Sequence, residues 1–328
     1  MTTDPTLRND SDDLAATDDI LVIGEALIDI VKKATGEQKE HPGGSPANVA
    51  ITLARLGRPA HLLTWFGGDE RGDLIAAHLN ESHVHLVDGS QSAERTPTAQ
   101  ATLDHDGSAQ YTFDIEWKIE ADLENFPHTA AAIHVGSIAA VLEPGAQRAA
   151  EIIEERRDTA TITYDPNIRP ALMGEPDEVR PLVEGLVGQS DVVKASDEDL
   201  EWLYPELTPD DVASNWINLG AGIVVITKGG AGATASTANH RVDIDAPPVH
   251  VVDTVGAGDS FMGALLDGLA DRGLLGAVQR ETLHNIGQDA LTEIVGHAVS
   301  VAAITVSRAG ANPPWLTELP DPIDAPKA

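Results

Sequence analysis

A glycine-rich segment near residue 256 holds the residue types best suited to chemistry. It reads DTVGAGDS over 253–260 and precedes FMGALLDGLADRG, whose apolar spacing predicts a helix. Small residues directly before a helix allow unpaired backbone N–H groups to hold an anion such as a phosphate. Asp259 lies at the start of this helix, where the helix dipole favours its ionised form, and can take a proton from a hydroxyl. An anion cradle and a proton acceptor in one turn are what phosphoryl transfer from a nucleotide requires.

The same segment differs from two common nucleotide-binding patterns. It has no G-K-[ST], so it is not a Walker A loop. The first predicted strand leads into GEALID rather than G-x-G-x-x-G, which argues against a dinucleotide-dependent dehydrogenase. An ordinary glycine turn with Asp259 as helix cap is the alternative interpretation. The preceding DT and the clear helix that follows favour the functional one.

Polar residues in the N-terminal part suit the binding of hydroxyl groups. In HPGGSPANVAITLARLG, a helix is predicted to begin at Pro46, and Asn48 lies in its first turn beside Gly43 and Gly44. The amide can exchange hydrogen bonds with the hydroxyl groups of a ligand, or it can serve as a helix cap. Asp29, near the end of an apolar strand, needs polar partners unless that strand end is exposed.

Small or polar residues also follow two later strands, and open parallel sheets bind ligands at the carboxyl ends of their strands. Arg169 is predicted near the substrate or its developing phosphate, and Asn167 either near the substrate or in a simple turn. Thr227, Gly229 and Gly232 form a turn on whose backbone a nucleotide can lie.

Short apolar segments alternate with helical patterns along most of the chain. The segment 146–157, for example, places Ala149, Ile152 and Ile153 on one face of a helix. Strands that alternate with helices predict parallel βαβ units and an α/β fold. The predicted strands are 20–31, 61–66, 132–137, 161–165, 191–196 and 222–228.

Residues 96–117 interrupt this alternation. Apolar and polar residues alternate on both sides of Asp106-Gly107, and a D-G pair between such runs predicts a β-hairpin. The hairpin is either a simple sheet edge or a functional lid spanning approximately 92–120.

The composition limits the classes of protein. The 328 residues are 42% hydrophobic and 4% aromatic, enough for one large domain with an aliphatic core. No cysteine is present, which excludes disulfides and thiolate chemistry and is consistent with a reducing cytoplasm. With 21 basic and 53 acidic residues the net charge is −32, which disfavours nucleic-acid binding. No uncharged apolar run reaches the roughly 18 residues of a membrane span.

Several motifs in order resemble those of the ribokinase-like, PfkB-type carbohydrate kinases, and within them the fructokinases. DTVGAGDSFMGALL is similar to the C-terminal signature of that family, and GGSPANVA followed by ITLARLG is similar to its N-terminal signature. The resemblance runs from about Ile20 to Leu316. The other matching segments are GEALID (24–29), GGDERG (67–72), DPNIRP (165–170), TKGGAG (227–232) and SRAGANPP (307–314).

The resemblance implies a three-layer α/β/α domain over 20–316 with a mostly parallel sheet and a small β-hairpin lid. A disordered acidic leader over 1–19 and a flexible tail over 317–328 are predicted to flank it. ATP with Mg²⁺ is the implied phosphoryl donor. Asp259 falls on the family's catalytic base, and Gly256, Ala257 and Gly258 fall on its anion hole.

The resemblance also assigns residues to the nucleotide and to ions. Many members carry Asn-x-x-Glu after a strand, where this chain has Ser196 and Asp199 behind Lys194, so the Mg²⁺ contact of Asp199 can run through water. A solvated helix start is the alternative. Thr254 either caps its turn or touches phosphate. Asp253 and the Val255 carbonyl, with the loop near 307–310, resemble the K⁺ site of some members.

These observations predict a sugar kinase, with fructose as the leading substrate and C6 as the phosphorylated position. Ketodeoxygluconate, ribose or a nucleoside are alternative acceptors, and a sugar sensor without catalysis is the alternative from another class. The predicted substrate-binding residues are Asp29, Gly43, Gly44, Asn48, Asn167, Arg169 and Asp259. A cytoplasmic enzyme is expected, with no nucleic-acid or membrane partner, and family members that dimerise through the lid make a homodimer an expectation.

Overall fold

The computed structural model describes residues 18–33, 35–103, 109–121 and 130–319. These residues form two β-sheets. The larger sheet has nine strands in the order β13-β12-β11-β10-β9-β8-β1-β4-β5 and is parallel from β11 to β5. The strands β12 and β13 extend it in antiparallel fashion. The chain therefore has the predicted α/β fold with a mostly parallel central sheet.

Most predicted strands lie within one or two residues of an observed one. Their fully buried apolar runs are typical of a sheet covered on both faces. The strands of the large sheet are β1 (Ile20–Ile23), β4 (Ala60–Leu63), β5 (His85–Leu86), β8 (Ala132–Gly136), β9 (Thr161–Asp165), β10 (Val192–Ser196), β11 (Ile223–Thr227), β12 (Ala233–Ser236) and β13 (Arg241–Ile244).

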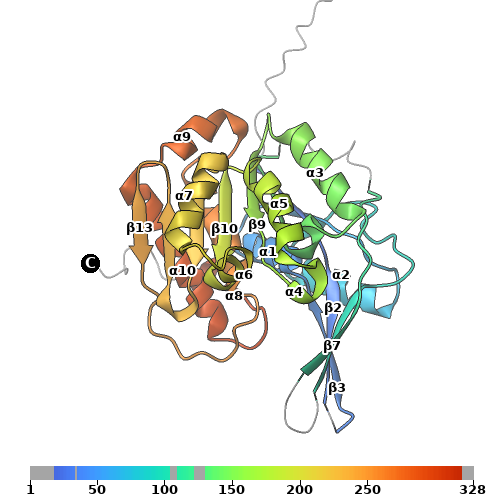
Figure 1. The fold of residues 1–328 in the computed structure, drawn as a ribbon. Helices are drawn as coiled ribbons and strands as arrows, with labels where there is room; N and C mark the ends of the chain where they lie inside the picture. Colours follow the sequence, from blue (N-terminus) through green and yellow to red (C-terminus); the bar gives the residue numbers. More distant parts are fainter. Residues whose placement is uncertain (1–17, 34, 104–108, 122–129, 320–328) are drawn as a thin grey trace, which may run out of the picture.

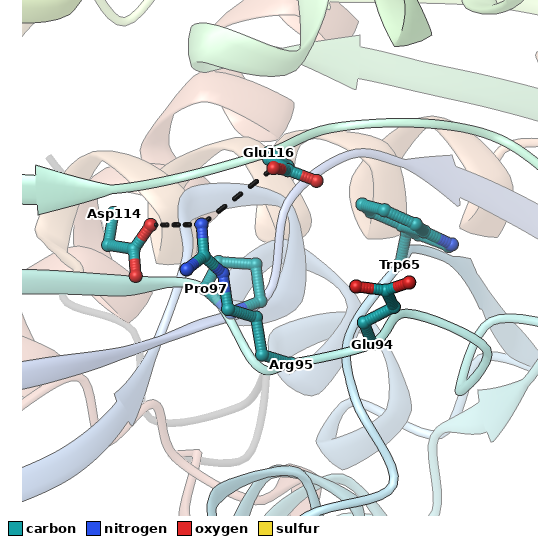
Figure 2. Close-up of a pocket in the computed structure, with 6 residues that line it drawn as sticks. All are labelled: Trp65, Glu94, Arg95, Pro97, Asp114 and Glu116. Atoms are coloured by element: carbon teal, nitrogen blue, oxygen red, sulfur yellow. Dashed lines mark ion pairs between the residues drawn. The ribbon is translucent and has the colours of Figure 1, made fainter.

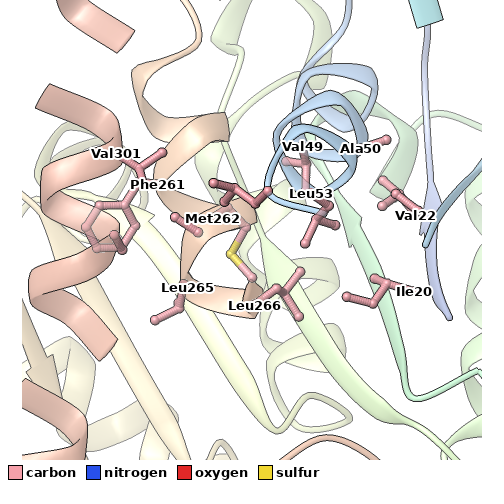
Figure 3. Packing of buried hydrophobic residues seen from close by; sticks show 14 of the residues in the cluster. Ile20, Val22, Val49, Ala50, Leu53, Phe261, Met262, Leu265, Leu266 and Val301 are labelled. Atoms are coloured by element: carbon pink, nitrogen blue, oxygen red, sulfur yellow. The ribbon is translucent and has the colours of Figure 1, made fainter. Parts of the chain in front are cut away.

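Helices cover both faces of the large sheet (Figure 1). One core cluster joins the sheet to α1, α2, α8 and α10, and Figure 3 shows Leu53 of α1 and Leu265 and Leu266 of α8 packed within it. A second cluster joins the opposite face to α3, α5, α6 and α7. The helices are α1 (Ser45–Arg55), α2 (Glu70–Glu81), α3 (Gly145–Arg156), α4 (Pro170–Met173), α5 (Pro176–Val187), α6 (Asp197–Leu203), α7 (Pro209–Leu219), α8 (Ala257–Asp271), α9 (Arg280–His284) and α10 (Gln288–Val306).

The smaller sheet projects beyond the edge of this α/β body (Figure 1). It has four strands in the order β3-β2-β6-β7, namely Gln38–Gly43, Leu27–Lys32, Thr98–Leu103 and Ala109–Asp114. The hairpin predicted within 96–117 is confirmed as the antiparallel pair β6–β7, while its Asp106-Gly107 turn lies outside the described residues. The lid is larger than predicted, because β2 and β3 extend the hairpin to a four-stranded lid sheet.

The prediction of one continuous strand over 20–31 is wrong. The chain leaves β1 after Ile23 and enters the lid sheet at Leu27, so this segment connects the two sheets. Gly24 has φ +157°, and a Cβ there would lie 2.2 Å from Pro46 Cγ, which explains why the chain can bend only with glycine at this position. Because the segment is apolar on both sides of the bend, its composition does not indicate that the strand ends at Ile23.

Two further features complete the fold. Leu316–Glu318 form a 3₁₀ turn, and Glu318 pairs with Arg308, so ordered chain continues past the predicted domain end at 316.

Among the described residues, α10 alone is long and apolar enough to cross a membrane by length and composition. That helix packs against α8, β12 and β13.

Candidate active site

The carboxylate of Asp259 lies where the N-termini of α1 and α8 meet. The Ser45 hydroxyl donates to Oδ1 of Asp259, and the Asn48 amide donates to Oδ2, each over 2.7 Å. All three side chains are buried. Gly263 allows this close approach of the two helices, because a Cβ there would lie 2.7 Å from Cβ of Thr52 on α1. Asn48, predicted as a sugar ligand, thus also orients the predicted base.

The first turn of α8 has the features of an anion site. Its N-cap, Gly256, has left-handed φ +75°, and no side chain of the described residues caps the helix. The N–H of Ala257 donates to the Thr254 carbonyl over 3.3 Å, and the other backbone N–H groups of this first turn can bind a ligand, with the positive end of the helix dipole behind them. A Cβ on Gly256 would lie 2.5 Å from Cβ of Ala311, so the turn requires glycine. The structure thus brings Gly256, Ala257, Gly258 and Asp259 into one turn.

A buried ion pair lies against this turn. Lys194 Nζ is 2.9 Å from Asp165 Oδ2, and a Cβ on Gly258 would lie 3.1 Å from the same Nζ. Apart from this contact with Lys194, neither Asp165 oxygen has a hydrogen-bond partner among the described residues. Burial raises the pKa of Asp165 to about 6 against the opposing effect of Lys194. Burial disfavours the Lys194 ammonium, but Asp165, Asp199 and Asp259 more than offset it and raise the pKa of Lys194.

The loop after β9 lies beside this pair. Asn167 has positive φ, +41°, and its buried Nδ2 has no hydrogen-bond partner among the described residues. A strained residue with a free buried donor is typical of a binding position. Arg169 bends back on this loop, and its guanidinium donates to the carbonyls of Asn167 and Ile168. The structure therefore places both predicted residues at the carboxyl edge of the sheet.

Ser196 and Asp199 have a clear structural task. Ser196 caps α6 in a capping box, in which its hydroxyl accepts from the Asp199 N–H and Asp199 Oδ2 accepts from the Ser196 N–H. Asp199 Oδ1 also accepts from the N–H of Ile168, over 2.8 Å. Both carboxylate oxygens of Asp199 thus accept hydrogen bonds from backbone N–H groups. The buried Asp199 therefore joins α6 to the loop that carries Asn167 and Arg169. A metal contact of Asp199 would run through water.

The lid sheet supplies the opposite wall. Asp29 is directly opposed by His41 and Ala99, and Ala99 by Phe113, so these four side chains project from one face. The Asp29 side chain is exposed, yet surrounding groups displace enough water to raise its pKa, against the opposing charges of His41 and Arg169. A Cβ on Gly43 would lie 2.1 Å from Oδ2 of Asp29, so the glycine predicted as a sugar contact leaves space for this carboxylate.

Glu25 is a buried carboxylate that the sequence analysis left without a role. It lies at the bend between the two sheets, and its carboxylate accepts from the N–H of Ala139 over 3.3 Å. Burial raises the pKa of Glu25 to about 7, with hydrogen bonds from Ser137 and backbone N–H groups opposing. The Glu25 carbonyl also packs against Gly44, where a Cβ would approach it to 2.4 Å. The sequence did contain a signal for this residue, because Glu25 is a charged residue within the apolar segment 20–31.

The residues predicted for the nucleotide lie at the ends of β10 and β11 and before α8. Thr227 donates to the carbonyl of Ala195, which joins the two strand ends. Gly229 has φ +52°, and no heavy atom of the described residues lies within 4 Å of where its Cβ would be. Gly232 has φ +91°, and a Cβ there would lie 1.9 Å from the Ile244 carbonyl. The backbone at Gly229 is therefore open to a ligand, while Gly232 is required by packing. Thr254 accepts from the N–H of Ala257 through its carbonyl.

Asp253, which is predicted to hold K⁺, bonds to backbone N–H groups through both carboxylate oxygens. Asp253 Oδ1 accepts from the N–H of Val255 over 3.1 Å, and Oδ2 accepts from the N–H of Gly310 over 2.9 Å. Those two backbone hydrogen bonds lower the pKa of Asp253. Asp253 thus joins the 307–310 loop to the α8 turn. Across the part of the chain that the structure describes, no group of three or more His, Asp or Glu side chains is arranged to hold a metal.

A pocket of about 240 Å³ opens at the base of the lid sheet and shares no residue with the Asp259 cluster (Figure 2). Arg95 pairs there with Asp114 over 2.7 Å and approaches Glu116 to 3.7 Å. The guanidinium of Arg95 is therefore already paired with carboxylates of the pocket itself. The lining residues are Trp65, Glu94, Arg95, Pro97, Asp114 and Glu116.

A lid sheet beside an α/β body, with a glycine-capped helix start next to a buried carboxylate, is the arrangement expected of a phosphotransferase. Residues 17–318 match the family model of the pfkB family carbohydrate kinases. The chain belongs to this family and is a sugar phosphotransferase.

Known relatives narrow the comparison. The chain is 34% identical over 265 residues to a fructokinase of Rhizobium leguminosarum bv. trifolii, covering 78% of this chain and 81% of the relative. A fructokinase structure from Xylella fastidiosa superposes with a TM-score of 0.79 at 26% identity, over 92% of this chain and 97% of that one. A double-mutant fructokinase from Vibrio cholerae O395, bound to fructose, ADP and potassium, gives 0.72 at 27% identity, over 90% and 94%.

Proposed function

We propose that this chain is a fructokinase that transfers the γ-phosphoryl group of ATP to fructose, giving fructose 6-phosphate. The observation that carries the proposal is the Asp259 carboxylate, held by Ser45 and Asn48 beside the uncapped start of α8. A proton acceptor and an anion site are thus adjacent in one turn. The choice of fructose rests on the names of the similar proteins.

In the proposed complex, the sugar lies between the lid face and the α8 turn. Asp29 and Asn48 bind its hydroxyls, and the Gly43-Gly44 backbone allows the ring to approach closely. Asn167, with its free Nδ2, and Arg169 contact the sugar from the sheet edge. The lid sheet excludes water, which limits hydrolysis of ATP.

The proposed chemistry uses groups of this chain at both ends of the transfer. Asp259 takes the proton from the sugar hydroxyl as its oxygen attacks the γ-phosphorus. Backbone N–H groups of Gly256, Ala257 and Gly258 stabilise the charge on the transferring phosphoryl oxygens. The Lys194 ammonium, buried against Gly258, adds positive charge at the same place.

We propose that ATP lies over the ends of β10 and β11. Ser196, Thr227, Gly229, Gly232 and Thr254 contact it there. An exposed apolar run before α8 suits the flat face of a purine; it consists of Val249, Val251, Val252 and Val255.

Mg²⁺ fits this site as a water-shelled ion that enters with the nucleotide. Within the described part of the chain, the two buried oxygens of Asp165 have no partner besides Lys194, and the charge of Asp199 acts on the same lysine. Mg²⁺ bound to the phosphates would offset their negative charge, and it commonly uses one or two carboxylates with several waters. Asp253 and the Val255 carbonyl are proposed to hold K⁺, the ion in the Vibrio cholerae structure.

We further propose a cytoplasmic enzyme that dimerises. The absence of cysteine from the sequence is consistent with a reducing compartment. The exposed Tyr111, stacked on Phe113 of the lid sheet, offers apolar area to a second copy.

Release of ADP, measured with MgATP and a panel of acceptors, tests the proposal. The panel is fructose, ribose, ketodeoxygluconate, adenosine and the fructose 1- and 6-phosphates. We expect one strong signal, with fructose, that Asp259→Asn abolishes. Turnover of another acceptor alone would replace the substrate and keep the mechanism. ATP binding without turnover of any acceptor would favour the sugar-sensor alternative.

A further inference from the structure

Ser45 makes an unusual hydrogen bond for a serine at a helix start. Serine at such positions commonly bonds to nearby backbone N–H groups of its own helix. Here the N-cap of α1 is Gly44, and no side chain in the described ranges caps the helix. The Ser45 hydroxyl instead donates to Oδ1 of Asp259 on α8. The serine therefore leaves its local partners and bonds the carboxylate that is the proposed base.

The two oxygens of Asp259 have partners of different chemistry. Oδ2 accepts from the Asn48 amide nitrogen, which can only donate. Oδ1 accepts from the Ser45 hydroxyl, which can donate or accept. Once the carboxyl carries a proton, the amide can bond only an unprotonated oxygen, whereas the hydroxyl can rotate and accept from a protonated one.

We propose that Ser45 is a positioning residue that makes Oδ1 of Asp259 the oxygen that receives the substrate proton; this inference rests on the proposed function. In the transfer, the O–H bond of the sugar breaks, its oxygen bonds to the γ-phosphorus and ADP leaves. The proton forms an O–H bond on Oδ1. Ser45 then reverses its hydrogen bond from donor to acceptor, while Asn48 keeps Oδ2 in place.

The Asp259 carboxylate is oriented by neutral hydrogen-bond donors rather than by a charged partner. Lys194 of β10 and Asp165 of β9 are the charged groups that act on it from the sheet, and they form an ion pair with each other. Among the described residues, no cation forms an ion pair with Asp259 itself. Its orientation therefore depends on Ser45 and Asn48.

The test compares Ser45→Ala and Ser45→Thr with the wild type. We expect Ser45→Ala to lower kcat about tenfold, the size expected for one lost hydrogen bond to a charged group, with KM for fructose changed less than about twofold. Ser45→Thr keeps the hydroxyl and should restore most of kcat. Unchanged kcat in a folded Ser45→Ala protein, or no rescue by threonine, would overturn the inference.

Two further variants separate this inference from the proposed function. Ser190→Ala removes another buried hydroxyl, bonded to the Leu186 carbonyl, and should leave kcat unchanged. In an Asp259→Asn background, Ser45→Ala should add almost nothing, because both act on one proton transfer. Equal losses in both backgrounds would show that Ser45 acts elsewhere and would overturn the inference. Full activity of Asp259→Asn alone would instead remove the base on which the proposed function depends.

Discussion

Helix α8 carries two buried aspartates whose surroundings differ in kind. Asp259, in the first turn, accepts from two neutral donors, Ser45 and Asn48. Asp267, two turns further along, is bonded by Arg58 over 2.6 Å and by His297 over 2.8 Å. Each carboxylate has both oxygens occupied, and each ties α8 to another part of the chain.

The difference shows two ways to hold a buried carboxylate: neutral donors orient it, whereas a bonded cation also neutralises its charge. A bonded guanidinium stabilises the charged carboxylate and makes it a poor proton acceptor. Neutral donors fix the direction of a carboxylate and leave its charge for the substrate. Asp191 resembles Asp267, since Arg280 and His284 bond it at the edge of the sheet beside α9. Burial opposes ionisation of Asp191, but those two partners outweigh it and lower its pKa.

The largest expected effect is at Asp259. Asp259→Asn preserves shape and should lower kcat by roughly 10²–10⁴-fold, the loss typical of a general base. Thermal unfolding should change little, because asparagine can keep one of the two neutral donors. Steady-state ADP release and a melting curve on the same sample measure both. Near-normal kcat would show that an oriented carboxylate at this position is structural after all.

Asp267 should show the opposite pattern. Asp267→Ala leaves Arg58 and His297 without their buried partner and should lower the free energy of unfolding by about 3 kcal/mol. Below the melting transition, kcat should stay near the wild-type value. Urea unfolding followed by fluorescence measures the first, and the ADP assay the second. A stable but inactive Asp267→Ala protein would contradict the distinction between the two aspartates.

Most residues of the candidate site could be selected from the sequence, because the patterns that mark them are local. The α8 turn depends on glycines and an aspartate within a few residues, and the buried strands are short apolar runs. The sequence did not reveal the bend at Gly24, because it depends on packing against Pro46. It did not reveal the four-stranded lid sheet either, because that sheet depends on pairing between strands distant in sequence. The bond from Ser45 to Asp259 spans 214 positions, so no local pattern could reveal it.

Glu25 extends the comparison to pH. Neutral donors bond it too, yet burial raises its pKa from 4.5 to about 7. Between those values the folded protein holds a proton that the unfolded chain has lost, so this group's stabilisation falls as pH rises from about 4.5 to 7 and then levels off. The full loss is at most about 3 kcal/mol. Glu25→Gln should flatten this slope and raise stability at pH 8. Urea titrations at several pH values measure it, and an unchanged slope would exclude Glu25 as its source.

Asp253 offers the smallest effect and tests whether a carboxylate can orient backbone and bind a cation at once. It accepts from the N–H groups of Val255 and Gly310, and it lies shortly before Gly256, the N-cap of α8. If K⁺ binds there, wild-type kcat should rise about fivefold when K⁺ replaces a bulky organic cation at constant ionic strength, a coupling of ordinary size. Asp253→Asn keeps an acceptor for one N–H and should lose most of this activation, whatever its basal rate. Equal activation ratios in the two proteins would place the cation elsewhere. Loss of the ratio alone would show that the charge of Asp253, rather than its backbone contacts, links the ion to the α8 turn.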